Sequence, residues 1–149
     1  MKATTRTYAG DYAFGKAGEE QTLPTLNKFF KAEMVGQGRY APFDFIDTNN
    51  TIFVELKTRN CSHNQYPTLW INYDKVATAK SALRTNPERK YYFAFNLKDG
   101  IWYAPYDEEL FSTFTDGWFQ RRDRDTNDPP QHILNIPVEH LRPINNIEP

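Results

Sequence analysis

The sequence has one cysteine and no long apolar segment. Cys61 by itself cannot form a disulfide within the chain or a zinc cluster of several thiolates, so we expect an intracellular, cytoplasmic protein. The longest uninterrupted apolar run, residues 91–95, is far below the roughly 18 residues that a membrane span requires. The N-terminus also lacks the apolar stretch of a secretory signal, so the sequence predicts a soluble protein with no membrane partner.

Internal repeats, low-complexity tracts and linkers rich in glycine and serine are absent as well. The length of 149 residues matches the size of about 150 residues that is usual for one domain. Hydrophobic residues make up 39% of the chain and charged residues 25%, a balance that excludes disorder for most of the length. We therefore expect a single domain over residues 1–149.

The sequence has no excess of basic residues, since its net charge is −1. The charge is unevenly distributed, however. Residues 51–100 carry 8 basic and 4 acidic side chains, whereas residues 101–149 carry 4 basic and 9 acidic ones. Phosphate contacts require a local positive surface rather than a positive total. The basic middle third therefore permits a nucleic-acid partner without requiring one.

A first helix is predicted over residues 18–35, because two leucines and Phe30 recur there at spacings of three and four. Pro24 lies within this stretch, and a proline inside a helix removes a hydrogen bond and clashes with the preceding turn. The helix is therefore expected either to kink at Pro24 or to begin only near residues 21–22.

The rest of the chain alternates strands and helices. We expect strands at residues 42–47, 51–58, 90–97 and 101–106, helices at residues 74–85 and 107–114, a polar loop at residues 121–130, and a last strand with a short turn at residues 132–144. The order of these elements is typical of an α/β fold in which a mixed β-sheet is flanked by helices.

The strand over residues 51–58 (TIFVELKT) changes character along its length. Its even positions are apolar from Ile52 to Leu56, whereas its odd positions end in Glu55 and Lys57. A loop at Asn49-Asn50 joins it to the preceding strand, because asparagine tolerates the positive φ of a tight turn. One face of this strand is therefore predicted to be core, and the other face to end in charge.

The register of this hairpin brings two carboxylates together. If the loop is Asn49-Asn50, Asp44 lies directly opposite Glu55, about 5 Å away. At an effective dielectric constant near 20, their repulsion would cost roughly 3 kcal/mol. A divalent cation would compensate this repulsion, and carboxylate oxygens suit Mg²⁺. Lys57 lies on the same face, where it can lower the pKa of a metal-bound water or neutralise a reacting phosphate.

These residues resemble the motif of the PD-(D/E)XK nucleases, also called restriction-endonuclease-like nucleases. Here the motif reads P42-F-D44, then ten residues, then E55-L-K57, so Phe43 splits the proline from the aspartate. The resemblance extends over roughly two-thirds of the chain and implies a restriction-endonuclease-like core with elements in the order α-β-β-α-β-β.

The resemblance also implies roles for site residues. Asp44 and Glu55 would hold Mg²⁺, or Mn²⁺ as a substitute, with help from the Leu56 carbonyl, and Lys57 would orient or activate the attacking water. Members of the superfamily often carry a further acidic residue on the first helix. Glu19 shares the apolar side of a continuous helix, so it is preferred over its neighbour for this role, in which it would support a water or second metal.

The reaction implied is hydrolysis of phosphodiester bonds in DNA; RNA as substrate and assembly into a homodimer stay open. Positive side chains near the motif would contact the phosphates that flank the scissile one. These are Arg59, Lys75, Arg121, Arg122 and Arg124.

Two other functions compete with a small metal-dependent nuclease. The first is a nucleic-acid-binding module without catalytic activity on the same fold, and the second is a structural or partner-binding protein. For most aromatic residues core packing is the better explanation, but for Trp102, Trp118 and Phe119 the sequence decides less between core packing and base stacking.

Overall fold

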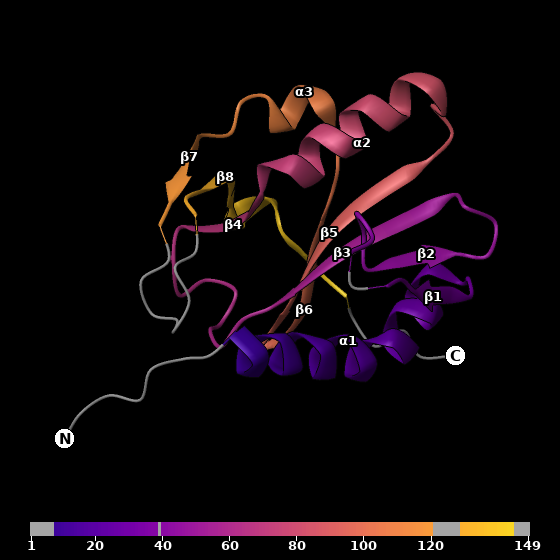
Figure 1. Ribbon diagram of the computed structural model, residues 1–149, viewed down its shortest axis with the longest axis horizontal. Helices are drawn as coiled ribbons and strands as arrows, with labels where there is room; N and C mark the ends of the chain where they lie inside the picture. Colours follow the sequence, from indigo (N-terminus) through magenta and orange to yellow (C-terminus); the bar gives the residue numbers. More distant parts are fainter. Residues whose placement is uncertain (1–7, 39, 121–128, 145–149) are drawn as a thin grey trace.

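Two sheets and two long helices make up the computed structural model, which describes residues 8–38, 40–120 and 129–144 (Figure 1). The elements are α1 (Tyr8–Phe30), β1 (Met34–Gly36), β2 (Phe45–Asp47), β3 (Ile52–Thr58), β4 (Thr68–Asn72), α2 (Tyr73–Thr85), β5 (Lys90–Leu97), β6 (Gly100–Pro105), α3 (Glu108–Phe111), β7 (Asp116–Phe119), β8 (Gln131–Pro137), a 3-10 turn (Val138–His140) and β9 (Arg142–Pro143). None of the helices in the described ranges is long and apolar enough to cross a membrane.

The first helix differs from its prediction at both ends. It begins ten residues earlier than the expected start of the 18–35 segment and continues through Pro24. It ends at Phe30, where Lys31 takes the left-handed conformation (φ 51°) that often follows the last helical residue. Residues 34–35, expected to be helical, belong instead to the edge strand β1 (Met34–Gly36).

Packing explains why α1 passes through its proline. Leu26, two residues after Pro24, is fully buried in a cluster with Val54 and Leu56 of β3. Burying such a side chain contributes about 2 kcal/mol, and several lie along this face. Together they offset the roughly 3 kcal/mol that proline costs inside a helix.

The larger sheet has six strands in the order β1-β2-β3-β5-β6-β9, and its central pair, β3 and β5, is parallel. The predicted mixed sheet is therefore confirmed. Strand β2 is shorter than expected, since only residues 45–47 of the 42–47 segment form a strand. Its register, Phe45 opposite Val54 and Ile46 opposite Phe53, is the predicted one. Asn50 takes a positive φ of 56° in the connecting turn, as expected.

Helices cover both faces of this sheet (Figure 1). Helix α1 packs against the face that carries Val54 and Leu56, whereas α2 packs on the opposite side, where Phe93 and Phe95 of β5 are buried. The alternation of β3 separates these two cores, because successive side chains of a strand point to opposite faces. The predicted α/β architecture, a mixed sheet flanked by helices, is confirmed.

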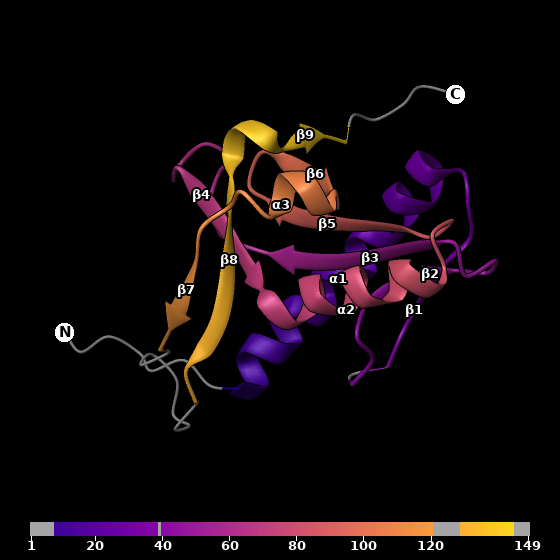
Figure 2. The same ribbon diagram turned by 90° about the horizontal axis from the view of Figure 1, so that it is seen from above.

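A second, three-stranded sheet in the order β4-β8-β7 was not expected. Viewed from above, it lies beside the C-terminal ends of β3 and β5 (Figure 2). Strands β4 and β7 were missed in the sequence, whereas β8 falls within the strand expected at 132–144. Leu69 and Ile71 of β4 are buried against the core that includes α2. This sheet therefore closes off the end of the larger sheet at which Glu55 and Lys57 lie.

Candidate active site

The site begins where β3 loses its partner on one side. Strand β2 pairs with β3 only at Phe53 and Val54, whereas β5 continues beside β3 as far as Thr58. The backbone N–H of Leu56 therefore donates to the Asp44 side chain at Oδ2 (2.7 Å). The Asp44 carboxylate thus accepts the hydrogen bond that a carbonyl of a neighbouring strand would otherwise accept. This bond fixes Asp44 beside Glu55.

Glu55 is buried, with 5% of its surface exposed, and points to the face of β3 opposite α1. Burial raises its pKa to about 8; the negative charge of Asp44 and a hydrogen bond between the two carboxyl groups act in the same direction. Lys57 and Lys75 act to lower that pKa, but only in part. Two carboxyl groups can share a hydrogen bond only if one is protonated, so this contact favours the protonated form of Glu55.

Lys57 lies next to this pair, and its Nζ is 3.6 Å from Oε2 of Glu55. Its side chain is only 19% exposed. Burial lowers the pKa of the ammonium group and the charge of Arg59 adds to this, whereas Glu55 and Asp44 raise it. The net direction is downward, so Lys57 releases its proton more easily than a lysine in water.

Glu19 approaches the site from α1. It is half-buried, whereas Glu20 is exposed, which agrees with the helical phase predicted for the two residues. Burial raises the pKa of Glu19 to about 7, and the charge of Asp44 raises it further. Asp44 thus acts on both Glu19 and Glu55, and all three side chains line the same cavity.

Gly18 lets α1 come this close to β3. A Cβ atom at position 18 would lie 2.0 Å from Oγ1 of Thr58, closer than two such atoms can approach. Only glycine fits this contact without a shift of the backbone. The helix–strand contact therefore fixes the position of the neighbouring Glu19.

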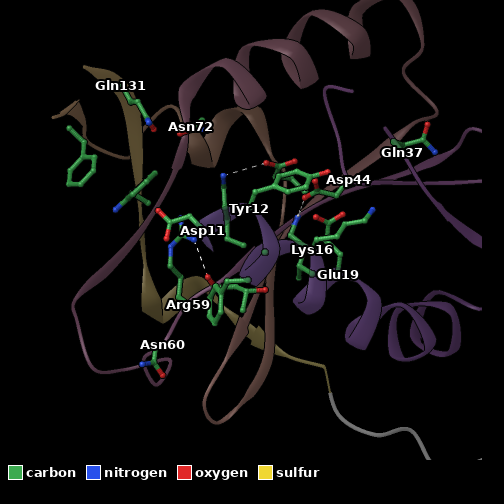
Figure 3. A pocket seen from close by; sticks show the side chains of 18 of the residues that line it. Asp11, Tyr12, Lys16, Glu19, Gln37, Asp44, Arg59, Asn60, Asn72 and Gln131 are labelled. Carbon is green, nitrogen blue, oxygen red and sulfur yellow. Dashed lines mark hydrogen bonds and ion pairs between the residues drawn. The ribbon is translucent and has the colours of Figure 1, made fainter. Parts of the chain in front are cut away.

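All these side chains line one cavity of about 850 Å³. One wall comes from the first half of α1, including Tyr12 and Lys16, and the floor from Asp44 and residues 55–60. The opposite wall comes from the second sheet. Figure 3 shows Lys16, Glu19 and Asp44 on one side of the cavity and Asn72 and Gln131 on the other.

The oxygen donors at the floor are of the kind that Mg²⁺ binds. Within the described residues, no three or more His, Cys, Asp or Glu side chains gather closely enough to hold an ion by themselves. Asp44 and Glu55 supply two carboxylates, and the main chain of Leu56 lies beside them in the cavity. Mg²⁺ is usually held by one or two carboxylates, with waters and substrate phosphate completing its six ligands. The donor set therefore fits this ion.

The predicted phosphate-binding residues fall into two groups. Arg59 lines the cavity, where its guanidinium lies 5.1 Å from the centre of the Trp70 ring. Lys75 is in the first turn of α2, close enough for its charge to affect the pKa of Glu55 and of Lys57. Arg121, Arg122 and Arg124 lie outside the described residues.

The sequence interpretation missed the two side walls. Lys16 lies three residues before Glu19, a spacing that places both on one side of a helix, but the helix was expected to begin only at residue 18. Trp70 lies between Leu69 and Ile71, whose alternation is a strand signal that could have revealed β4 and its cavity-facing side chains.

Comparisons with known proteins come from curated sequences, solved structures and protein families. No curated protein matches the chain significantly. The solved structure of Hjc, a Holliday junction resolvase from the archaeal hyperthermophile Archaeoglobus fulgidus, is similar to it at 15% sequence identity and a TM-score of 0.46, covering 81% of this chain and 94% of that one. The model of the family described as "Phage putative PDDEXK endonuclease" matches residues 17–144, which include Glu19, Asp44, Glu55 and Lys57, and the chain therefore belongs to that family.

Proposed function

We propose that this protein is a metal-dependent deoxyribonuclease that hydrolyses phosphodiester bonds of DNA, with Mg²⁺ as its cofactor and Mn²⁺ as a substitute. The observation that carries the proposal is the pairing of half-buried Asp44 with buried Glu55, with Lys57 beside them, at the floor of one cavity. Membership in an endonuclease family supports the same activity.

Asp44 and Glu55 would hold the Mg²⁺ ion, together with the main-chain carbonyl of Leu56. The raised pKa of Glu55 supports this assignment, because a cation would add positive charge beside two adjacent carboxyl groups that Lys57 and Lys75 balance only in part. When bound, Mg²⁺ lowers the pKa of a coordinated water and neutralises charge on the phosphate.

Lys57 would act on the attacking water. Its Nζ lies beside Glu55. Because the pKa of Lys57 is lowered, Nζ gives up its proton more readily near neutral pH than a lysine in water does. Nζ can thus hold the water by a hydrogen bond and exchange a proton with it. While protonated, the same group stabilises the negative charge that develops on the phosphate.

Glu19 would hold a second water or a second ion on the other side of Asp44. Because its raised pKa is about 7, the group accepts or donates a proton near neutral pH. Arg59 in the cavity and Lys75 at the start of α2 would bind the phosphates that flank the scissile one.

Cleavage of DNA in the presence and absence of divalent metal tests the proposal. Purified protein with Mg²⁺ or Mn²⁺ is expected to cleave DNA, and with EDTA it is not. Glu55→Ala and Lys57→Ala are each expected to abolish cleavage while the circular dichroism spectrum stays that of the wild type. Retained cleavage in both variants would overturn the assignment of the site.

Glu19 and Glu20 offer a matched pair for the same assay, because they are adjacent on α1 and differ in exposure. Glu19→Ala is expected to slow cleavage and Glu20→Ala to leave it unchanged. If the wild type binds DNA with a steep salt dependence but never cleaves it, the chain is a binding module. If it neither binds nor cleaves DNA, a partner-binding role remains.

A further inference from the structure

The cavity wall formed by the second sheet carries four uncharged side chains. In this sheet Phe119 lies opposite Gln131, and Asn72 lies opposite Ile133, two residues further along β8. Side chains at paired positions point to the same face, and so do those two residues apart. Trp70, Asn72, Phe119 and Gln131 therefore share one face, and all four line the cavity.

Two of these side chains are aromatic rings that lie side by side. The ring centres of Trp70 and Phe119 are 5.3 Å apart with an angle of 31° between the planes, and both rings are half-buried. The guanidinium of Arg59 lies over Trp70. Aromatic rings and guanidinium planes are the groups on which proteins stack nucleobases, and such stacking tolerates any base.

The other two side chains are amides, which can donate to and accept from the edge of a base. Asn72 precedes the first turn of α2, but its side chain does not cap that helix. Its Oδ1 is buried and has no hydrogen-bond partner within the described part of the chain. A buried acceptor without a donor destabilises a protein, so a donor from a bound molecule would compensate for it.

We propose that this wall binds an unpaired nucleobase beside the scissile phosphate, so that the preferred substrate is DNA with at least one unpaired nucleotide rather than an intact duplex. The inference rests on the proposed nuclease function, because it takes the DNA to enter the cavity at the Asp44–Glu55 pair. In a duplex each base is stacked and paired, and its faces are unavailable to Trp70 or Phe119. An unpaired nucleotide offers both a free face and a free edge.

Charge and size favour the same occupant. The phosphate side of the nucleotide belongs at the floor, where Lys57 and Arg59 lie and where a cation would bind. The base belongs at the uncharged wall. The volume of about 850 Å³ lies in the range of roughly 300–1,000 Å³ that pockets for small ligands occupy. Such a cavity suits individual nucleotides better than a length of double helix.

Binding assays in EDTA test the inference without depending on cleavage. Fluorescence anisotropy would give the Kd of the wild type for a labelled single strand and for the same sequence as a duplex, at one salt concentration. The single strand is expected to bind more tightly. Phe119→Ala and Trp70→Ala are each expected to weaken single-strand binding about 10-fold and to leave duplex binding unchanged. Phe119→Trp is expected to restore the affinity.

Trp118 provides the matched control. It follows the same strand as Phe119 but points to the other face, where it stacks on His132, and it is 71% exposed. Trp118→Ala is therefore expected to leave single-strand binding unchanged. If Trp118→Ala weakens binding as much as Phe119→Ala, the cavity wall is not the site of stacking.

A series of single strands with one abasic position each would locate the contact. The wild type is expected to lose about 10-fold in affinity at one or two positions. Phe119→Ala is expected to lose nothing further at those positions, because the stacking partner is already absent. Equal losses in the two proteins would overturn the inference.

Other outcomes also decide. Equal affinity of the wild type for single strand and duplex, or unchanged single-strand binding in a folded Phe119→Ala, would overturn the inference. If Trp70→Ala unfolds, the test rests on Phe119→Ala, because Phe119 lies on the edge strand β7. Thermal melting checks that each variant is folded. Cleavage in Mg²⁺ without a base-dependent effect on binding would reject only the proposal that the wall binds a base. Base-dependent binding without cleavage would reject only the proposed nuclease activity.

Discussion

Asp47 and Glu55 lie at opposite ends of the same β2–β3 hairpin, and both carboxyl groups are buried, with 4% and 5% of each residue exposed. Their surroundings differ. Burial acts to raise the pKa of Asp47, but hydrogen bonds from the Ile52 N–H and from the hydroxyl and N–H of Thr51 together lower it below its usual value. Glu55 has another carboxyl group as its neighbour, and its pKa is raised to about 8.

The difference separates a structural carboxylate from a site carboxylate. Asp47 receives all its donors from its own turn, so its charge is stabilised by the fold itself and stabilises the fold in return. Glu55 has its charge only partly balanced by Lys57. Burial alone therefore does not mark function. We propose that function is marked here by a buried carboxyl group to which the fold supplies too few donors, so that a ligand would complete its contacts.

Glu55→Gln should have the largest effect, and on activity alone. Without the carboxylate the site would lose a ligand of the ion, so we expect the DNA cleavage rate in Mg²⁺ to fall about 1,000-fold or more, measured under single-turnover conditions. Because the amide removes the repulsion with Asp44, the melting temperature at pH 8 without metal should not fall. A strongly destabilised Glu55→Gln would show that Glu55 is as structural as Asp47.

Asp47→Ala should have the opposite consequence. Its two backbone donors in the turn and the hydroxyl of Thr51 would lose their acceptor, so we expect the free energy of unfolding in urea to fall by about 3 kcal/mol. The cleavage rate at a temperature where the variant stays folded should match that of the wild type. If Asp47→Ala is as stable as the wild type, Asp47 is not a structural carboxylate.

The pH dependence of stability should also separate the two carboxylates. The folded-state pKa of Glu55 lies above its unfolded value of 4.5, so its contribution is fully present below that value and is lost as pH rises toward about 8. We expect the unfolding free energy of metal-free protein to fall over this window by up to about 1.4 kcal/mol per pH unit. The Glu55→Gln variant should show a flatter curve, and Mg²⁺ should flatten the wild-type curve.

Asp47 should act in the opposite pH range. Its lowered pKa contributes stability that is present above the unfolded value of 3.8 and is lost as pH falls through the folded value. Asp47→Ala should therefore remove part of the acid-induced loss of stability below pH 4 and leave the slope above pH 5 intact. A change in the upper slope instead would mean that the two carboxylates are coupled.

Lys75→Met should have the smallest effect. Its charge acts on Glu55 and Lys57 and is absent from the influences on Asp47. We expect DNA binding to weaken a few-fold, and the slope of log Kd against log salt to change by about one, because one phosphate contact is lost. An unchanged salt slope would indicate that Lys75 affects only the pKa values of Glu55 and Lys57 and does not contact DNA.

The hairpin could be predicted from sequence because its information is local. Alternating side chains on β3 and an asparagine turn specify the register, and the register alone brings Asp44 opposite Glu55. The family resemblance rests on these same residues, and the family match confirms it. What the register could not give is the hydrogen bond from the Leu56 N–H to Asp44, which exists because β2 begins only at Phe45.

The walls of the cavity depend on packing between distant segments, which local patterns do not record. The start of α1 before residue 18 has little apolar periodicity, and Pro24 argued against a continuous helix, yet burial of Leu26 holds it together. Trp70 and Phe119 lie on strands of five and four residues, and they meet only because both pair with β8. A single short strand carries too weak a signal to predict its partners.

The contact between Gly18 and Thr58 sets how closely α1 approaches β3. Even one added methyl group at position 18 would force the helix away from β3, and a rigid helix would carry Lys16 and Tyr12 outward together with Glu19. Larger side chains at this one position would thus widen the mouth of the cavity in graded steps and move Glu19 away from Asp44, while Asp44, Glu55 and Lys57 stay in place. One position on α1 would therefore set both the width of the cavity and the position of Glu19.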